Sequence, residues 1–230
     1  MRGARVAVLD YEPRRPRGAG IVAGHGYSSS KHNLDALCSF LAAHGFHVAS
    51  VDFPGHKLGA SGGRLDHPDD LVDAMEAGVA HLRETYGVPS YALGHSMGAI
   101  AALRTCAADP SVAGAVSIAT GVGRPLALAA LARGGAVDLR SAYVAGLTLP
   151  QLVDATEPLI APALARFAGR PSLFIAADRD AMVATASARA LFDLAYEPKT
   201  FVTIASDHTY AGENARAAVL AWLGERYPRS

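Results

Sequence analysis

Cysteine, net charge and long apolar runs are all in short supply in this chain. Only two cysteines occur among 230 residues, and Cys38 and Cys106 lack the spacing of a metal site or a disulfide framework. Twenty-one basic residues balance twenty-one acidic ones, so the net charge does not favour nucleic acid as a partner. No stretch approaches the roughly 18 apolar residues of a membrane span, and the first residues lack the apolar core of a signal peptide. We therefore expect a cytoplasmic protein with buried free thiols and with no bound metal or cofactor.

Half of the residues are apolar, which is enough to bury a substantial core in a single domain covering 1–230. Short apolar runs alternate with longer helical patterns, and this alternation predicts an α/β fold with a mainly parallel sheet covered by helices on both faces. The expected strands are at 6–9, 20–23, 47–51, 91–93, 115–119, 173–176 and 200–204. The expected helices are at 34–44, 71–86, 97–108, 185–195 and 214–226.

The alternation stops between about 121 and 169, where leucines recur among prolines at 125, 150, 158 and 162. This pattern predicts several short amphipathic helices inserted after a strand. These helices either cover the sheet or form a small cap that offers apolar side chains to a hydrophobic part of a substrate. We favour the cap.

The segment Gly94-His95-Ser96-Met97-Gly98 follows an apolar strand and precedes a helix of small residues. A strand, a sharp turn and a helix in this order form a nucleophile elbow, which exposes Ser96 at its tip. Glycine is needed at 94 and 98 because the strained turn brings neighbouring backbone too close for a Cβ atom. A second Gly-x-Ser-x-Gly match, at 59–63, follows no strand and leads into a loop, so we set Ser61 aside.

A serine hydroxyl needs a histidine base, and the base needs a carboxylate that fixes its tautomer. Among nine histidines we choose His208, which lies between the last expected strand and the last helix, at the edge where parallel sheets bind ligands. Asp178 and Asp180 compete for the role of the carboxylate after the preceding strand. Asp180 lies two residues further into its loop and can swing toward His208, so it is our assignment, with Asp178 in reserve. Asp207 is a poor candidate because a residue adjacent to the base seldom reaches its neighbour's Nδ1.

Two backbone N–H groups are also required, because the tetrahedral intermediate of acyl transfer carries an oxyanion. Met97 supplies one N–H from the start of its helix, and Tyr27 supplies the other from the loop Gly24-His25-Gly26-Tyr27. The glycines of this loop allow its backbone to approach a substrate closely. We expect His25 itself to be structural.

The order serine, aspartate, histidine, with the elbow and the His-Gly loop, resembles the α/β-hydrolase superfamily over nearly the whole chain. Within it the chain is most similar to small serine esterases and monoacylglycerol-lipase-like hydrolases. Residues 51–56 resemble that family's Asp-x-x-Gly-x-Gly stretch, and 177–183 its Gly-x-x-Asp-x-x-Val stretch, which places the family's acid on Asp180. Ala177 stands where the family has glycine, and the glycine loop is one residue longer at Leu58. The resemblance implies an α/β-hydrolase fold, here with one strand fewer at the N-terminal edge than the family's full sheet.

These features predict a carboxylesterase that cleaves esters of short-to-medium acyl chains through an acyl-enzyme, with a small-molecule ester as its partner. Thioester or peptide hydrolysis would use the same residues. A peptidase would need an acidic pocket for a free amine, yet the acidic residues of 121–169 are limited to Asp138, Asp154 and Glu157. A dehalogenase or epoxide hydrolase would carry aspartate at the elbow. A non-catalytic binding protein is a further alternative, but such a protein would be expected to lack a triad member.

Overall fold

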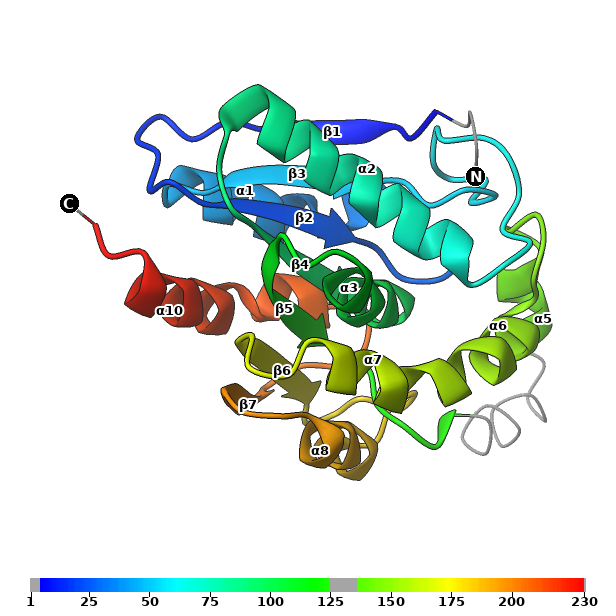
Figure 1. The fold of residues 1–230 in the computed structure, drawn as a ribbon. Coiled ribbons are helices and arrows are strands. Elements are labelled where there is room, and N and C mark those ends of the chain that lie inside the picture. The colour runs from blue at the N-terminus through cyan, green and yellow to red at the C-terminus, as the bar shows by residue number, and fades with distance from the viewer. Residues whose placement is uncertain (1–4, 125–135, 230) are drawn as a thin grey trace.

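A seven-stranded sheet forms the centre of the computed structural model, which describes residues 5–124 and 136–229 (Figure 1). The strand order is β1-β3-β2-β4-β5-β6-β7. The edge strand β1 (Val8–Tyr11) pairs antiparallel with β3 (His47–Val51), and every other pair of neighbours is parallel. The remaining strands are β2 (Gly20–Gly24), β4 (Ser90–His95), β5 (Val112–Ile118), β6 (Ser172–Ala177) and β7 (Lys199–Ile204).

Each of the seven strands expected from the sequence is present, with ends that agree to within three residues. Every residue of β2, β3, β4 and β6 is buried. Because both faces of such a parallel strand are buried, its sequence is a continuous apolar run, and these runs predicted the strands. The prediction of an α/β fold with a mainly parallel sheet is confirmed.

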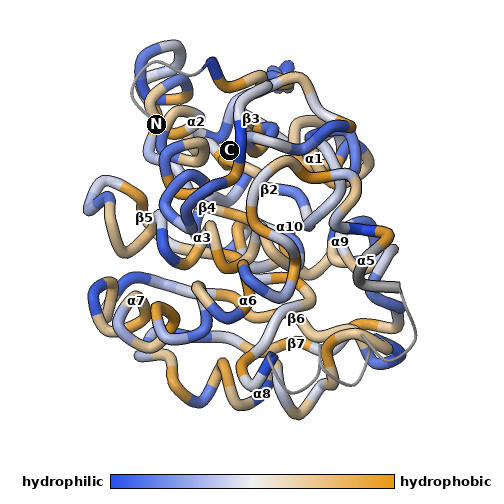
Figure 2. The backbone as a smooth tube through the Cα atoms, turned by 90° about the vertical axis from the view of Figure 1, so that its right-hand side faces the viewer, coloured by the Kyte–Doolittle hydropathy of each residue, from blue (hydrophilic) through white to orange (hydrophobic). Residues whose placement is uncertain are grey.

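Helices cover both faces of the sheet (Figure 1). On one face α2 (Asp69–Tyr86), α3 (Met97–Ala108) and α8 (Thr185–Leu194) bury side chains in one core. On the other face α1 (Asp35–Ala43) and α10 (Arg216–Arg226) form a second core, in which Leu37 and Trp222 are buried. Hydrophobic and hydrophilic stretches alternate along outer helices such as α7 and α8 (Figure 2), as expected for helices with one face on the core.

Two short elements accompany these helices. The 3-10 helix η1 (Lys31–Leu34) leads directly into α1. The helix expected at 214–226 is divided, because the short α9 (Ala211–Asn214) precedes α10. Within the described ranges, no helix combines the length and the apolar character that crossing a bilayer requires.

Between β5 and β6 the chain forms a run of short helices, as the sequence pattern predicts. They are α5 (Ala136–Ser141), α6 (Leu149–Thr156), η2 (Glu157–Leu159) and α7 (Ile160–Arg166). The prolines and leucines at 125, 126, 128 and 131 that contributed to the pattern lie outside the described residues. A capping box starts α6: the Thr148 hydroxyl accepts the N–H of Gln151, and the Gln151 side chain accepts the N–H of Thr148.

The stretch before α6 is bonded to the loop that follows β3. The N–H of Ala145 donates to the carbonyl of Gly55 over 2.8 Å, and the N–H of Leu147 donates to that of Leu65 over 2.7 Å. This pairing holds the start of α6 beside the carboxyl edge of the sheet.

Parallel pairing brings the carboxyl ends of β2, β4, β6 and β7 to one edge of the sheet. The loops that leave these ends carry Tyr27, Ser96, Asp180 and His208 respectively. Open parallel sheets bind their ligands at this edge, so a functional site is expected here.

Candidate active site

Ser96 lies at a sharp turn between β4 and α3, with a positive φ of 55° and a ψ of −114°. A residue with a side chain adopts such a conformation only under strain, and the surrounding glycines allow it. A Cβ at Gly94 would lie 1.9 Å from the carbonyl oxygen of Gly98, and a Cβ at Gly98 would lie 2.1 Å from that of Gly24. Ser96 is partly exposed while both of its neighbours are buried, so the turn presents this one side chain.

The side chains of Ser96, His208 and Asp180 form one hydrogen-bonded line. The Ser96 hydroxyl donates to Nε2 of His208 over 3.0 Å, and the Nδ1–H of His208 donates to Oδ2 of Asp180 over 2.7 Å. We assign the ring proton to Nδ1 because the carboxylate can only accept, which leaves Nε2 free to accept from the serine. This arrangement can remove a proton from Ser96 and so make its oxygen nucleophilic.

Asp180 is suited to balance a positive charge on His208. Its side chain is only 1% exposed, and its Oδ1 accepts the N–H groups of Met182 and Val183 over 2.8 Å each. Burial by itself would raise the pKa of Asp180, but the hydrogen bond to His208 and those from the two N–H groups hold it below its usual value. The carboxylate is therefore ionised at neutral pH.

The two competing aspartates have other partners. Asp178 accepts the N–H of Ser206 over 3.0 Å, and Asp207 accepts the N–H of Tyr210 over 3.0 Å. Both bonds shape the loop that carries His208. Of the three aspartates considered from the sequence, only Asp180 is bonded to the histidine ring in the part of the chain that the structure describes.

His95, which the sequence analysis did not select, holds the backbone of His208 by a hydrogen bond. Its Nε2–H donates to the backbone carbonyl of His208 over 2.8 Å. Burial, followed by the neighbouring charge of His208, lowers the pKa of His95 to about 4, so its ring is neutral at pH 7. Its position directly before the serine is the one signal in the sequence that could have drawn attention to it.

The two predicted oxyanion donors belong to segments that border the site of Ser96. Met97 is the first residue of α3, so its N–H belongs to the first turn, where helical N–H groups have no acceptor within the helix. Tyr27 lies in the loop after β2, which lines the same pocket as Ser96 and His208. The Tyr27 hydroxyl donates to the carbonyl of Leu147 over 2.9 Å and so ties this loop to the start of α6.

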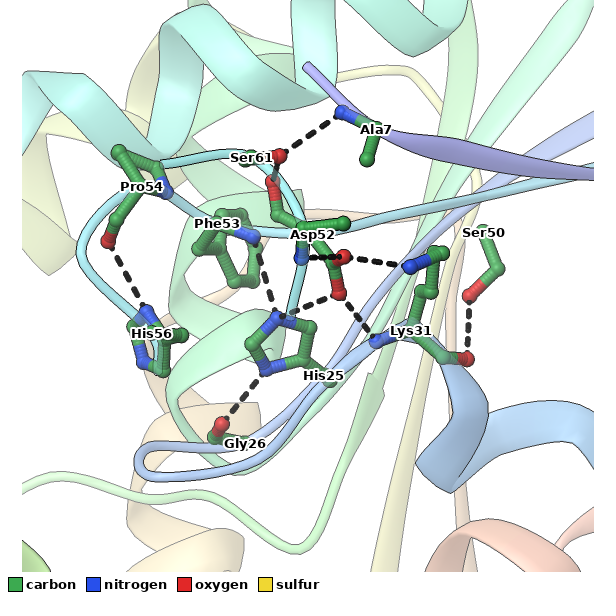
Figure 3. A network of polar contacts seen from close by, with 11 residues as sticks. Ala7, His25, Gly26, Lys31, Ser50, Asp52, Phe53, Pro54, His56 and Ser61 are labelled. Atoms are coloured by element: carbon green, nitrogen blue, oxygen red, sulfur yellow. Dashed lines mark hydrogen bonds and ion pairs between the residues drawn. The ribbon is translucent and has the colours of Figure 1, made fainter. Parts of the chain in front are cut away.

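His25 holds the loop of Tyr27 in place, as expected of a structural residue (Figure 3). Its Nδ1–H donates to the carbonyl of Gly26 over 2.8 Å, and its Nε2 accepts the N–H of Phe53 over 3.1 Å. The ring is fully buried, and burial lowers its pKa to about 3. A neutral ring with one donor and one acceptor satisfies both bonds.

Beside His25 lies a buried ion pair that the sequence analysis missed (Figure 3). Lys31 Nζ lies 2.6 Å from Oδ2 of Asp52, and the N–H of Lys31 donates to Oδ1 over 2.7 Å. The N–H of Ala60 also donates to this carboxylate over 2.7 Å. Burial would raise the pKa of Asp52, but the hydrogen bonds from Lys31 and Ala60 hold it below its usual value. The pair connects η1, the end of β3 and the loop at 55–63 that follows β3.

Ser61, in the second Gly-x-Ser-x-Gly match, belongs to this network and not to the line through His208. Its hydroxyl donates to the carbonyl of Asp52 over 2.7 Å and accepts the N–H of Ala7 over 2.8 Å (Figure 3). Both bonds anchor the loop at the buried side chain of Ser61.

Residues 15–157 match the family model described as serine aminopeptidase, S33 (Hydrolase_4). The match covers more than half of the chain and includes the elbow and the Tyr27 loop. The chain belongs to this family of α/β hydrolases.

Solved structures have the fold of this hydrolase over nearly its whole length. A monoacylglycerol lipase from Paleococcus ferrophilus is 20% identical, with a TM-score of 0.70 over 96% of this chain and 99% of the other. A cold-adapted esterase from an Arctic intertidal metagenomic library is 17% identical, with a TM-score of 0.70 over 99% and 91%. Est1E from Butyrivibrio proteoclasticus, with ferulic acid bound, is 16% identical, with a TM-score of 0.72 over 99% and 98%. At these identities the likeness shows the shared fold. No match was found among curated protein sequences.

An apolar pocket of the hydrolase opens at Ser96 and His208. It runs between the first turns of α2 and α3 and the helix α6. Its apolar lining consists of Leu71, Met97, Ile100, Leu149, Leu152, Val153, Met182 and Val183.

One charged residue, Arg124, also lines this apolar pocket. Its Nε donates to Glu157 over 2.8 Å, and its Nη2 donates to the hydroxyl of Thr156 over 3.0 Å. The partner carboxylate neutralises the guanidinium, so the pair adds no net charge to the pocket.

A second pocket of the hydrolase also opens at Ser96 and His208, and it shares Leu149 and Met182 with the first. Its lining is mostly polar and comes from the Tyr27 loop, the His208 loop and α5. The residues around it are Gly26, Tyr27, Ser28, Ser29, Asn33, His95, Arg140, Leu149, Met182 and Thr209. The reacting centre of a substrate placed at Ser96 would therefore have an apolar environment on one side and a polar environment on the other.

Proposed function

We propose that the hydrolase is a carboxylesterase acting on esters of short-to-medium acyl chains, with Ser96 as nucleophile, His208 as base and Asp180 as the acid that orients it. The observation that carries the proposal is the hydrogen-bonded line of these three side chains at the mouth of an apolar pocket. Such a pocket suits an uncharged acyl chain.

In the proposed reaction, Ser96 Oγ attacks the ester carbonyl while Nε2 of His208 takes its proton. The negative charge of Asp180 stabilises the imidazolium that results. The N–H groups of Tyr27 and Met97 bind the oxyanion, and loss of one such donor costs about 10² to 10³ in kcat in comparable enzymes. His208 then protonates the departing alcohol, and a water molecule activated by His208 hydrolyses the acyl-enzyme.

The neutral state of His95 favours this scheme. A second positive charge beside His208, whose ring centroid lies 5.0 Å from that of His95, would oppose formation of the imidazolium. Because burial keeps His95 uncharged, it supports the base through its hydrogen bond without this penalty.

We further propose that the helices within 121–169 form a cap on a single domain covering 1–230. Leu149, Leu152 and Val153 of α6 contribute to the wall of the apolar pocket. The stretch before α6 is hydrogen-bonded to the loop that follows β3, and Glu157, directly after α6, is bonded to Arg124. These links would hold α6 over Ser96.

A cytoplasmic location stays a prediction.

An ester is favoured over a peptide by the charges around Ser96. An aminopeptidase must accommodate the free ammonium group of its substrate, for which a carboxylate is the usual partner. Among the described residues, neither pocket at Ser96 is lined by aspartate or glutamate, and Glu157 is engaged with Arg124. The side chain of Asp138 lies outside the described residues.

The test is hydrolysis of p-nitrophenyl esters from acetate to palmitate, beside an amino-acid p-nitroanilide and an acyl thioester. We expect ester turnover by the parent and by Ser39→Ala, which changes an exposed serine of α1, and a loss of several orders of magnitude for Ser96→Ala. Turnover of the anilide or the thioester with inert esters would assign the triad to that reaction and contradict the proposal. Full activity of Ser96→Ala would refute the mechanism.

A further inference from the structure

The two pockets at Ser96 divide an ester into its two halves. Both include Ser96, His208, Leu149 and Met182, so a carbonyl carbon at Ser96 has one pocket on each side. The apolar pocket suits an acyl chain, as the proposed esterase function requires. The polar pocket is then left for the alcohol part of the ester.

The two pockets differ in how their arginines are compensated. In the apolar pocket, the guanidinium of Arg124 is paired with Glu157. In the polar pocket, Arg140 has no carboxylate within 4 Å and no hydrogen-bond acceptor for its side chain among the residues that the structure describes. Arg140 is half-buried in the last turn of α5, which limits its hydration.

Among the described residues, the other groups around Arg140 do not supply the missing negative charge. Of the titratable residues that line the polar pocket, His95 is neutral and the ring of His208 is engaged with Ser96 and Asp180. Asp180 itself is buried behind the histidine and accepts three hydrogen bonds. The positive charge of Arg140 is felt at the site, where it contributes to the lowered pKa of His95.

The remaining polar groups of this pocket are hydrogen-bonding side chains. Ser28 and Ser29 come from the loop after β2, Asn33 from η1, and Thr209 follows His208. A guanidinium beside hydroxyl and amide donors is the combination that binds the oxygens of a carboxylate or phosphate.

We propose that Arg140 is a specificity-determining residue that binds an anionic group, carboxylate or phosphate, carried by the alcohol part of the ester. The preferred substrate is therefore an amphiphilic ester with an uncharged acyl chain on one side and a negatively charged alcohol on the other. This inference rests on the proposed esterase function. It also gives a second reason for poor binding of peptides with a free ammonium group, because Arg140 would repel that group.

The first experiment compares two esters of matched shape, 4-acetoxybenzoate and 4-acetoxybenzamide, whose leaving groups differ by one negative charge. A second pair, 1-butyrylglycerol 3-phosphate and 1-butyrylglycerol, tests phosphate in place of carboxylate. For at least one pair we expect kcat/KM to be about tenfold higher for the anionic ester, mainly through a lower KM, because the contact is to a part of the substrate that does not react. The pair with the larger ratio identifies the anion.

Arg140→Gln removes the charge and keeps a polar side chain of similar length. We expect it to reduce the ratio of kcat/KM between the anionic and the neutral ester from about tenfold to near unity. Arg166→Gln, at an exposed position at the end of α7 and away from the polar pocket, is the matched control and should leave the ratio unchanged. High salt should weaken the preference of the parent, since screening reduces the attraction between partly exposed charges.

A binding measurement separates this inference from the esterase proposal. Calorimetry on the Ser96→Ala protein with 4-hydroxybenzoate, glycerol 3-phosphate and their neutral counterparts requires no turnover. If Ser96→Ala binds an anion more tightly than its neutral counterpart, and the double variant Ser96→Ala, Arg140→Gln does not, the role of Arg140 is supported even if no ester is hydrolysed. The inference is overturned if Arg140→Gln leaves both the kcat/KM ratio of anionic to neutral ester and the binding of the anions unchanged. Hydrolysis of neutral esters would still sustain the esterase function in that case.

Discussion

The Nε2–H of His95 donates to the backbone carbonyl of His208 over 2.8 Å, so the residue before the proposed nucleophile holds the residue that we propose as its base. The bond links the elbow after β4 directly to the loop after β7, across a separation of 113 residues in the chain. Because both ring nitrogens of His208 are engaged by side chains, its backbone is the point at which a further contact can fix its position.

Replacing His95 should therefore weaken catalysis without removing a reacting group. We expect His95→Ala to lower kcat by about 10²-fold with little change in KM, because a small displacement of the base disturbs proton transfer. His95→Gln, whose amide can still donate, should recover part of the loss. Steady-state kinetics with circular dichroism on both variants checks this, and equal kcat values for parent and His95→Ala would exclude the positioning role.

The choice between the two aspartates after β6 can be tested with matched variants. Asp180→Asn removes the charge that fixes the tautomer of His208, and we expect a fall of about 10⁴ in kcat. Asp178→Asn changes a half-exposed carboxylate that accepts the N–H of Ser206, and its effect on kcat should stay within about tenfold. The assignment fails if the two variants exchange these effects.

Stability should fall as the pH drops below about 6.5, the ordinary pKa of a histidine. His25 and His95 have folded-state pKa values of about 3 and about 4, both lowered chiefly by burial from an ordinary value of 6.5. Between pH 6.5 and these lower pKa values, the histidines bind protons in the unfolded chain but not in the folded chain. The stability that they contribute is therefore present above pH 6.5 and is lost as the pH falls toward 4. Each histidine contributes up to about 1.4 kcal/mol per pH unit.

Urea unfolding of the protein at pH 7.5, 6.5, 5.5 and 4.5 measures this slope. His95→Gln removes one of these groups and should reduce the slope between pH 6 and 4.5, while His47 and His56, whose pKa values burial also lowers, contribute to the slope that remains. Asp52 and Asp180, whose pKa values are lowered from 3.8, add a further loss only below that value. A flat profile between pH 6.5 and 5 would mean that neither histidine stays neutral in the folded state.

The glycine after Met97 should tolerate no side chain at all. A Cβ at Gly98 would lie 2.1 Å from the carbonyl oxygen of Gly24, which belongs to the neighbouring strand and cannot move without disturbing the sheet. We expect Gly98→Ala to prevent accumulation of folded protein. Gly224→Ala is the matched control, because its Cβ meets only the end of Arg17 at 3.7 Å on α10, and it should unfold at the same or a higher temperature. Comparison of soluble yield and melting temperature checks both.

The amino-acid pattern predicts the sheet and the elbow because both depend on neighbours in the chain. Continuous apolar runs mark buried parallel strands, and the glycines around Ser96 are required by a local turn whose close contacts the structure reports. The positions of His208 and Asp180 follow from the same reasoning, since loops after parallel strands meet at one edge whatever the details of packing.

Other features have no local signature. Lys31 and Asp52 form a buried ion pair between segments 21 residues apart, and nothing in either segment distinguishes them from solvated charges. Likewise, Arg124 and Arg140 look alike in sequence. Only their surroundings show that Arg124 is neutralised by Glu157, while Arg140 faces a pocket that no carboxylate of the described residues lines.

The sequence by itself determined the fold class, the elbow and the three side chains that meet there, because local patterns of apolar residues and glycine mark the buried strands, the sharp turn and the loops that follow the strands. The tertiary structure alone decided what surrounds them: the neutral state of His25 and His95, the support of His208 by His95, and the separation into an apolar and a polar pocket. These depend on burial and on contacts between segments far apart in the chain, which set the local dielectric and the hydrogen-bond partners of each group.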